Sequence, residues 1–179
     1  PAKRNFASLQ NRTDEIRREL NALEDSNENK NKLLSDLELL ALSIPEREDG
    51  DERDAASKRV LKLSDKYPDN LQILTTAALT MAASGNKEAA DKLLQKLKTK
   101  LGIDSFLYAA TAARAASLTG NPKDASDSLR IFANDNPSMA RDALMLAAQI
   151  MTNQGEPKAV YDLLLTIPED QRTVKAVYK

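Results

Sequence analysis

The chain of 179 residues contains no cysteine, no histidine and no tryptophan. Without cysteine there is no disulfide framework and no thiol nucleophile, and without histidine the commonest general base and an ordinary zinc ligand are missing. The sequence also lacks glycine-rich phosphate-binding loops and the G-x-S-x-G motif of serine hydrolases. Its carboxylates stand among Lys and Arg on predicted solvated helix faces. We therefore expect no catalytic residues, no cofactor, no metal site and no enzymatic activity.

An excess of charge of one sign is missing too, because 26 basic residues face 27 acidic ones for a net charge of −1. A balanced chain carries no cationic field that attracts nucleic acid or anionic lipid, so we expect neither partner. The longest weakly apolar stretch, Leu79 to Ala83, is too short to cross a bilayer. No signal-peptide-like apolar segment follows the first five residues. We expect a soluble chain, either cytoplasmic or, if a signal was removed, periplasmic.

Glycine is scarce, yet its placement is the most informative feature of the sequence. Four of the five glycines, Gly50, Gly85, Gly120 and Gly155, follow one another at intervals of 35 residues. A period in the thirties is typical of helical-hairpin repeats. Aromatic residues make up only 4% of the chain, so the interior of these hairpins must be built from Ala, Leu, Ile, Val and Met.

Other positions recur at fixed distances from the glycines. Seven residues before the last three glycines stand Ala78, Ala113 and Ala148, and five residues after them stand Ala90, Ala125 and Val160. Nine residues after them stand Leu94, Leu129 and Leu164, and twelve residues after them stand Leu97, Phe132 and Ile167. Small residues in the first helix of each pair let two helices approach closely. The pattern resembles the tetratricopeptide repeat (TPR). The resemblance implies an all-α, right-handed α-solenoid of about four repeats over residues 31–179.

Helix ends can be predicted from the residues around each glycine. We expect a left-handed C-terminal residue, an asparagine N-cap and a proline in the first turn of the next helix. Gly85 and Gly120 are the predicted left-handed residues, and Asn86 and Asn121 are the predicted N-caps. Pro122 and Pro157 are the predicted first-turn prolines. The predicted helices span 71–84, 87–100, 105–118, 122–133, 139–153 and 157–166. In the first repeat we expect a helix over 33–43, a charged loop over 46–52 and a second helix that ends near Tyr67.

The resemblance also implies where a partner binds. In the TPR family, residues at fixed distances before the turn glycine line a concave groove. Transferred to this sequence, those positions predict a groove made by Gln72, Thr75, Leu79, Leu107, Arg114, Leu118, Met145, Gln149 and Asn153, together with Ala82, Ala83, Ala110, Ser117, Asp142 and Thr152. The set holds too few basic residues for the carboxylate clamp found in part of the family. We expect a small, partly apolar groove for a protein partner, either a peptide or a helix.

Residues 1–30 precede the repeats and contain a heptad pattern. Its apolar positions include Phe6, Leu9, Ile16, Leu20 and Leu23, which predict an amphipathic helix over 4–24. Polar residues interrupt the pattern at 25–29, either as a turn between helices or as a polar layer in one coiled coil. The apolar stripe either caps the first repeat or forms a homo-oligomer with a second copy.

Two further functions compete with a groove-binding adaptor or assembly factor. The first is a structural subunit docked through the N-terminal helix and the repeat ends. For the adaptor or assembly factor, the arrangement of a coiled-coil-like helix before such repeats is similar to bacterial envelope and secretion-apparatus accessory proteins, but only in architecture. The second is RNA binding, since pentatricopeptide repeats also have 35 residues, although the net charge of −1 opposes it. Gln171 to Lys179 resembles the start of another helix, either a cap or a continuing repeat.

Overall fold

The computed structural model describes residues 2–23, 29–42, 52–155 and 157–167, without the side chains of residues 2–7 and 52–54. The described chain is all-α and has no strand. Its elements are α1 (Ala2–Ala22), α2 (Lys30–Ala41), α3 (Glu52–Lys66), α4 (Leu71–Ala83), α5 (Lys87–Leu101), α6 (Phe106–Leu118), α7 (Pro122–Asp135), the 3₁₀ turn η1 (Pro137–Met139), α8 (Ala140–Thr152) and α9 (Pro157–Leu164). The backbone forms two compact units, residues 1–80 and 81–179.

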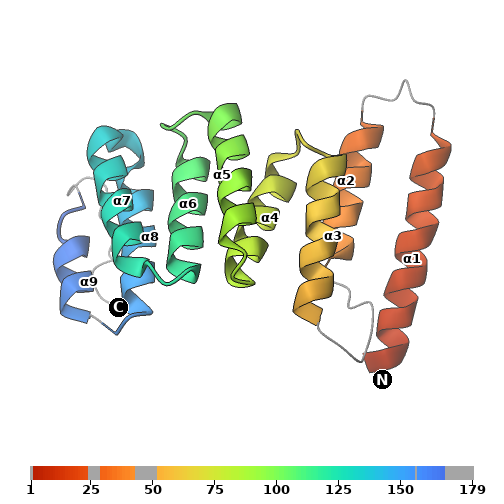
Figure 1. Ribbon diagram of the computed structural model, residues 1–179, viewed down its shortest axis with the longest axis horizontal. Coiled ribbons are helices and arrows are strands. Elements are labelled where there is room, and N and C mark those ends of the chain that lie inside the picture. Colours follow the sequence, from red (N-terminus) through yellow and green to blue (C-terminus); the bar gives the residue numbers. More distant parts are fainter. Residues whose placement is uncertain (1, 24–28, 43–51, 156, 168–179) are drawn as a thin grey trace. The chain divides into compact units, whose positions relative to one another are not determined.

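In the first unit, α1 and α2 lie side by side (Figure 1). The Arg17 guanidinium donates two hydrogen bonds to the Glu38 carboxylate, from Nε at 2.7 Å and from Nη2 at 3.1 Å. These residues are 21 positions apart, which in one continuous helix is about 31 Å. The contact therefore excludes a single coiled-coil helix through α1 and α2. Residues 24–28, the main part of the predicted turn or polar layer, lie outside the described residues.

The start of α4 is fixed by an asparagine that the sequence analysis did not identify as a cap. The Asn70 Oδ1 accepts hydrogen bonds from the backbone amides of Gln72 and Ile73, both at 3.0 Å. The Asn70 Nδ2 donates to the Ser35 hydroxyl of α2 at 2.8 Å. A side-chain cap satisfies amides that the first helical turn leaves without partners. This cap also ties α4 to α2.

In the second unit, the turn glycines end their helices in the same way. The amide of Asn86 donates to the Met81 carbonyl at 2.9 Å, and the amide of Gly85 donates to the Ala82 carbonyl at 3.1 Å. The same pair of bonds recurs one repeat later, around Gly120, at 2.9 and 3.2 Å. Both glycines have a left-handed φ, +82° and +88°. These bonds define the Schellman motif, which terminates a helix at a left-handed residue.

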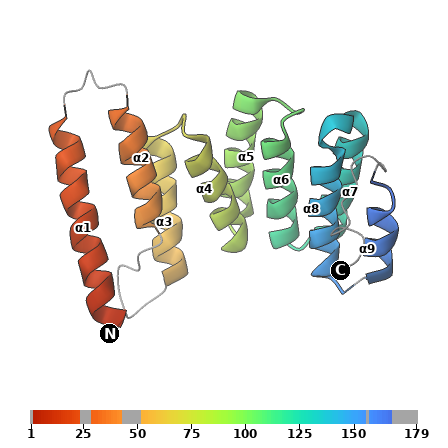
Figure 2. The same cartoon turned by 180° about the vertical axis from the view of Figure 1, so that it is seen from behind.

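The core of the second unit is formed by α6–α9. α7 packs on α6 and α8, and α9 packs on α8. Seen from behind in Figure 2, α8 lies in front of α7. Alanine dominates the contact surface, with Ala143 and Ala147 fully buried beside Leu129 and Ile167. The Phe106 and Phe132 rings lie with centroids 6.1 Å apart. The scarcity of aromatics predicted such a core of small aliphatic residues.

The predicted helices agree with the structure to within two residues from residue 71 onward, and the predicted first-repeat helix (33–43) corresponds to α2. The Asn86 side chain caps α5, accepting from the amide of Ala89 at 3.1 Å. Asn121 is the N-cap residue of α7, as predicted, but its side chain makes no cap hydrogen bond. Gly50, most of the charged loop and residues 171–179 lie outside the described residues. Among the described helices, none is both long and apolar enough to cross a membrane.

Candidate partner-binding groove

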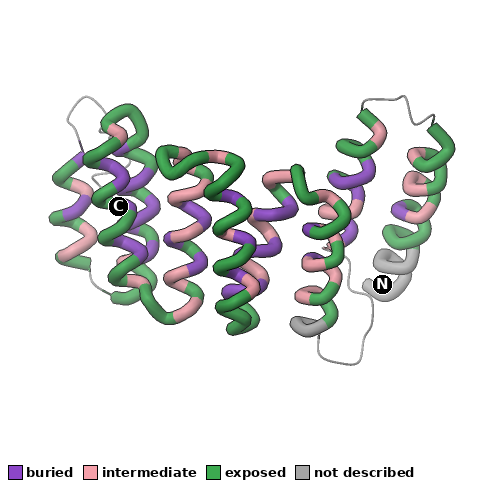
Figure 3. The backbone as a smooth tube through the Cα atoms, turned by 45° about the horizontal axis from the view of Figure 1, so that its top comes forward, coloured by how far each residue is buried: buried purple, intermediate pink, exposed green. Residues whose placement is uncertain are grey.

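α8 is buried on most of its surface and exposes one narrow face. Seven of its residues, including Ala143, Ala147 and Ile150, are buried. The predicted groove residues Met145, Gln149 and Asn153 (at the C-cap) are all exposed, with Asp142 and Thr152 beside them. Figure 3 shows exposed and buried segments alternating along the helices of this unit. We call Met145, Gln149 and Asn153 the α8 stripe, since positions four apart share one helix face.

α6, which contacts α8, exposes a similar face. Leu107, Arg114 and Leu118 are exposed at spacings of seven and four residues, which places them on one side of the helix. We call these three residues the α6 stripe. Leu107 is 41% and Leu118 is 52% exposed, so large apolar side chains face solvent on a helix that is otherwise rich in alanine. Ala110, which the resemblance also assigned to the groove, is buried and is not available to a partner.

The main predicted groove residues of α4, which are Gln72, Thr75 and Leu79, lie in the first unit and are less exposed. Gln72 is exposed, while Thr75 and Leu79 are half-buried and the Thr75 hydroxyl has no hydrogen-bond partner. Ala82, predicted for the same groove, is buried, and this assignment was wrong. An open cleft of about 360 Å³ does adjoin α4, but of the three main predictions it includes only Gln72. Its lining is Leu39, Leu42, Ala56, Val60, Gln72, Thr76 and Thr80.

The predicted docking face of the N-terminal helix is only partly covered. Ile16 and Leu20 are half-buried in α1, which packs on α2. Leu9 and Leu23 remain 53% and 39% exposed. The side chain of Phe6 lies outside the described part of the structure. α2 therefore covers the middle of the predicted stripe and leaves apolar surface near both ends.

The structure contains a second cleft that sequence reasoning missed. It lies between α6 and α7, has a volume of about 580 Å³ and opens to solvent. Its lining residues are Ile103, Asp104, Tyr108, Ala109, Ala112, Ala113, Ala116, Asp124, Ala125, Ser128, Ile131, Phe132, Asp135 and Asn136. Ile131 is the signal that could have indicated it, because this apolar residue lies outside the buried face of α7 and is 62% exposed. We call this feature the α6–α7 cleft.

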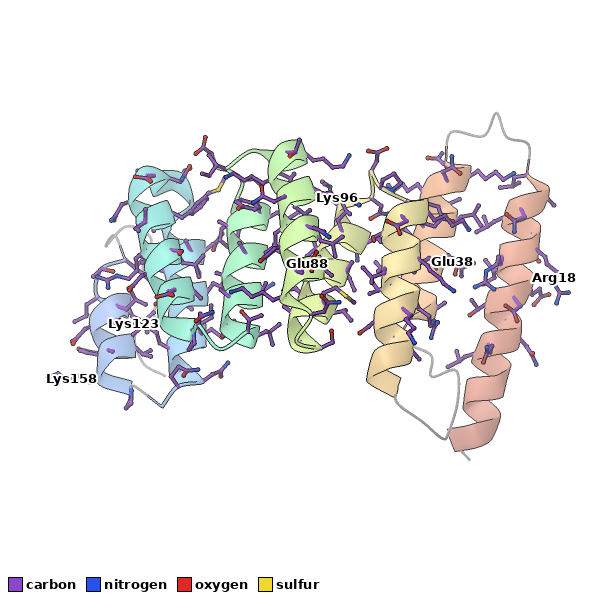
Figure 4. The ribbon with its side chains drawn as sticks, viewed as in Figure 1. Arg18, Glu38, Glu88, Lys96, Lys123 and Lys158 are labelled. Carbon is purple, nitrogen blue, oxygen red and sulfur yellow. The ribbon has the colours of Figure 1, made fainter. Side chains whose placement is uncertain are left out.

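Outside these surfaces, ion pairs shift the pKa values of charged side chains. Hydrogen bonding to Glu38, with a further contribution from Asp14, raises the pKa of Arg17 above its ordinary value. Figure 4 shows that the neighbouring Arg18 projects away from α2. On α5, the hydrogen bond from Lys92 at 2.7 Å lowers the pKa of Glu88. Within the described residues, acidic side chains form no group of three that could hold a metal ion.

No protein-family model, curated protein or solved structure matches the chain.

Proposed function

We propose that this chain is a non-enzymatic, TPR-like α-solenoid scaffold that holds a peptide or helix of a partner protein in the groove formed by the first helices of its repeats. The observation that carries the proposal is the α8 stripe. On a helix buried on nearly every other side, the exposed positions include Met145, Gln149 and Asn153, which the resemblance assigned to ligand contact.

The chemistry of the stripes supports a peptide ligand. Leu107, Leu118 and Met145 offer apolar surface that a partner can cover, and exposed apolar patches commonly mark interaction sites. Gln149 and Asn153 carry amide groups that can both donate to and accept from a peptide backbone. An extended peptide or amphipathic helix satisfies both requirements, because it presents apolar side chains and polar groups together.

The proposal is tested by selecting binders of the full chain from a displayed library of random peptides and measuring each affinity by fluorescence anisotropy. We expect Arg114→Glu/Met145→Glu to weaken the selected peptides by about tenfold or more, since a few central residues dominate such interfaces. Lys123→Glu reverses the charge of an exposed residue of α7 and is a control for the Arg114 charge reversal (Figure 4). If the control and the double variant bind every selected peptide equally well, the groove is not the binding site.

A second candidate function is a structural subunit docked through the N-terminal helix. The observation in its favour is the apolar surface left on the α1–α2 pair. Leu9 and Leu23 on α1 and Leu33 and Leu40 on α2 are between 39% and 66% exposed. Such surface costs solubility unless another protein covers it.

A further inference from the structure

The α6–α7 cleft has an apolar floor and an acidic rim. Alanines of α6, among them Ala109, Ala112 and Ala116, form its floor together with Phe132 of α7, and Ile103 and Ile131 stand at its edge, each 62% exposed. A volume of about 580 Å³ is enough for several side chains of a partner. Small floor residues leave room for larger apolar side chains to enter from outside.

The charges at this cleft have a single sign. Asp104, Asp124 and Asp135 line it, and its lining includes no Lys or Arg. Asp135 is the last residue of α7, where the helix dipole is already negative and the last turn has no basic residue. Asp104 lies just before α6, which runs antiparallel to α7, so it stands at the same end of the cleft as Asp135. The end of the cleft that carries Asp104 and Asp135 therefore attracts positively charged groups.

The chain itself contains a segment with the complementary chemistry. The first twelve residues carry Lys3, Arg4 and Arg12 and no acidic residue. They include the whole first half of α1, whose N-terminus adds the positive end of a helix dipole. Phe6 and Leu9 are three residues apart and share a helix face. Leu9 remains 53% exposed even though α1 packs on α2.

We propose that the N-terminal half of α1 from a second copy of the chain docks in the α6–α7 cleft. Phe6 and Leu9 cover the apolar floor, and Lys3 and Arg4 face Asp104 and Asp135. The N-terminus of α1 then lies at the C-terminal end of α7, so the two helix dipoles attract. α7 has 14 residues and is about 21 Å long, which leaves room for three turns of α1 beside it.

The predicted contact joins different surfaces of the two copies. Such a contact is heterologous, so when two copies pair through it, one copy keeps a free cleft and the other keeps a free helix, to which further copies can bind. The proposal rests on the second candidate function, self-docking through the N-terminal helix. It uses the side of α6 that bears Ala109 and Ala112, and not the α6 stripe. Failure here would leave the groove proposal intact, because the two tests use different variants.

The test is sedimentation velocity of the full chain over a range of concentrations and salt. We expect the average mass to rise with concentration and to fall with added salt, which screens exposed charge pairs. Leu9→Glu and Ile131→Glu change exposed residues, so both variants should fold. Each should weaken self-association by about tenfold to a hundredfold, since an apolar contact of the interface is lost and a carboxylate would have to be buried in its place. Tyr161→Glu, at a 54% exposed tyrosine of α9 that belongs to neither proposed surface, is the matched control and should behave as the wild type.

Mixing the two variants decides between head-to-tail docking and other arrangements. Leu9→Glu keeps an intact cleft and Ile131→Glu keeps an intact helix, so an equimolar mixture should form a one-to-one complex and no longer chains. The proposal is overturned if the wild type stays monomeric at every concentration, as docking within one chain predicts. It is equally overturned if the mixture stays monomeric, or if only Leu9→Glu abolishes association, as a symmetric contact between two α1 helices predicts.

Discussion

Two glycines with nearly the same φ should respond differently to the same pair of substitutions. Gly120 has φ +88° and ends α6 in a Schellman motif, whose left-handed residue also occurs as asparagine. Gly102 has φ +81° and ψ 165°, a backbone region that is accessible essentially only to glycine. An added Cβ meets no atom within 4 Å at either position, so the cost of substitution is backbone strain alone.

The magnitudes follow from that strain. A left-handed alanine costs about 1–2 kcal/mol, of which about 0.4–1 kcal/mol is offset because alanine restricts the unfolded chain. Gly120→Ala should therefore destabilise the fold by about 1 kcal/mol, and Gly120→Asn by clearly less. At Gly102 both substitutions should cost about 1–3 kcal/mol, and asparagine should give no relief.

Urea unfolding followed by circular dichroism measures these differences, with the wild type and the four variants compared under one condition. A loss of 1 kcal/mol corresponds to about 2–4 °C in Tm for a chain of this size, so thermal melts provide an independent check. The reasoning is refuted if Gly120→Ala is neutral, or if asparagine relieves the cost at Gly102 as well as at Gly120.

Three further predictions concern single side-chain interactions. Asn86→Ala should cost about 1 kcal/mol of unfolding free energy because its cap bond is lost, whereas Asn121→Ala, without such a bond, should cost less than half of that in the same urea assay. Glu38→Gln should destabilise the first unit by about 1 kcal/mol, seen as earlier unfolding of α1 in hydrogen exchange, because it weakens a partly buried bidentate pair. An NMR titration should find the pKa of Glu88 below its ordinary value, and Lys92→Met should restore it. Because the folded pKa is depressed, this pair stabilises the fold above the unfolded pKa of Glu88, and the effect is lost as pH falls through the folded pKa.

The helices were predictable because residues close to each helix end determine where the helix begins or stops. Gly85 and Gly120 require a left-handed backbone that a helix cannot continue through, and Pro122 fits only the first turn of the next helix. Such signals act within a few residues and do not depend on tertiary packing. The Asn70 cap was not predicted, because no glycine marks the end of the preceding helix there, as Gly85 does before Asn86.

The residues of the exposed stripes were predicted from the resemblance to the tetratricopeptide repeat, which implies that positions at fixed distances before each turn glycine line a groove. Failures occurred at alanines. Ala82 and Ala110 fit either a groove floor or a helix contact by size, and packing makes both of them buried. The α6–α7 cleft was not predictable, because it depends on how closely neighbouring helices approach. A face with Ala109, Ala112 and Ala116 predicts close packing, yet here it is left open.

The two proposed surfaces follow from one property of α6. α6 has 13 residues and is rich in alanine, whose side chain is small. The chemistry of each face of the helix is therefore decided by the larger side chains beside the alanines. On one side Leu107, Arg114 and Leu118 supply apolar and cationic contacts. On the other side the alanines form a floor, and the neighbouring elements supply the exposed isoleucines and the carboxylates. The one charged residue of the α6 stripe is Arg114, whereas the charged residues that line the cleft are all acidic, so the two faces differ in charge. One short helix can therefore serve a partner peptide and a second copy of the chain without competition between them.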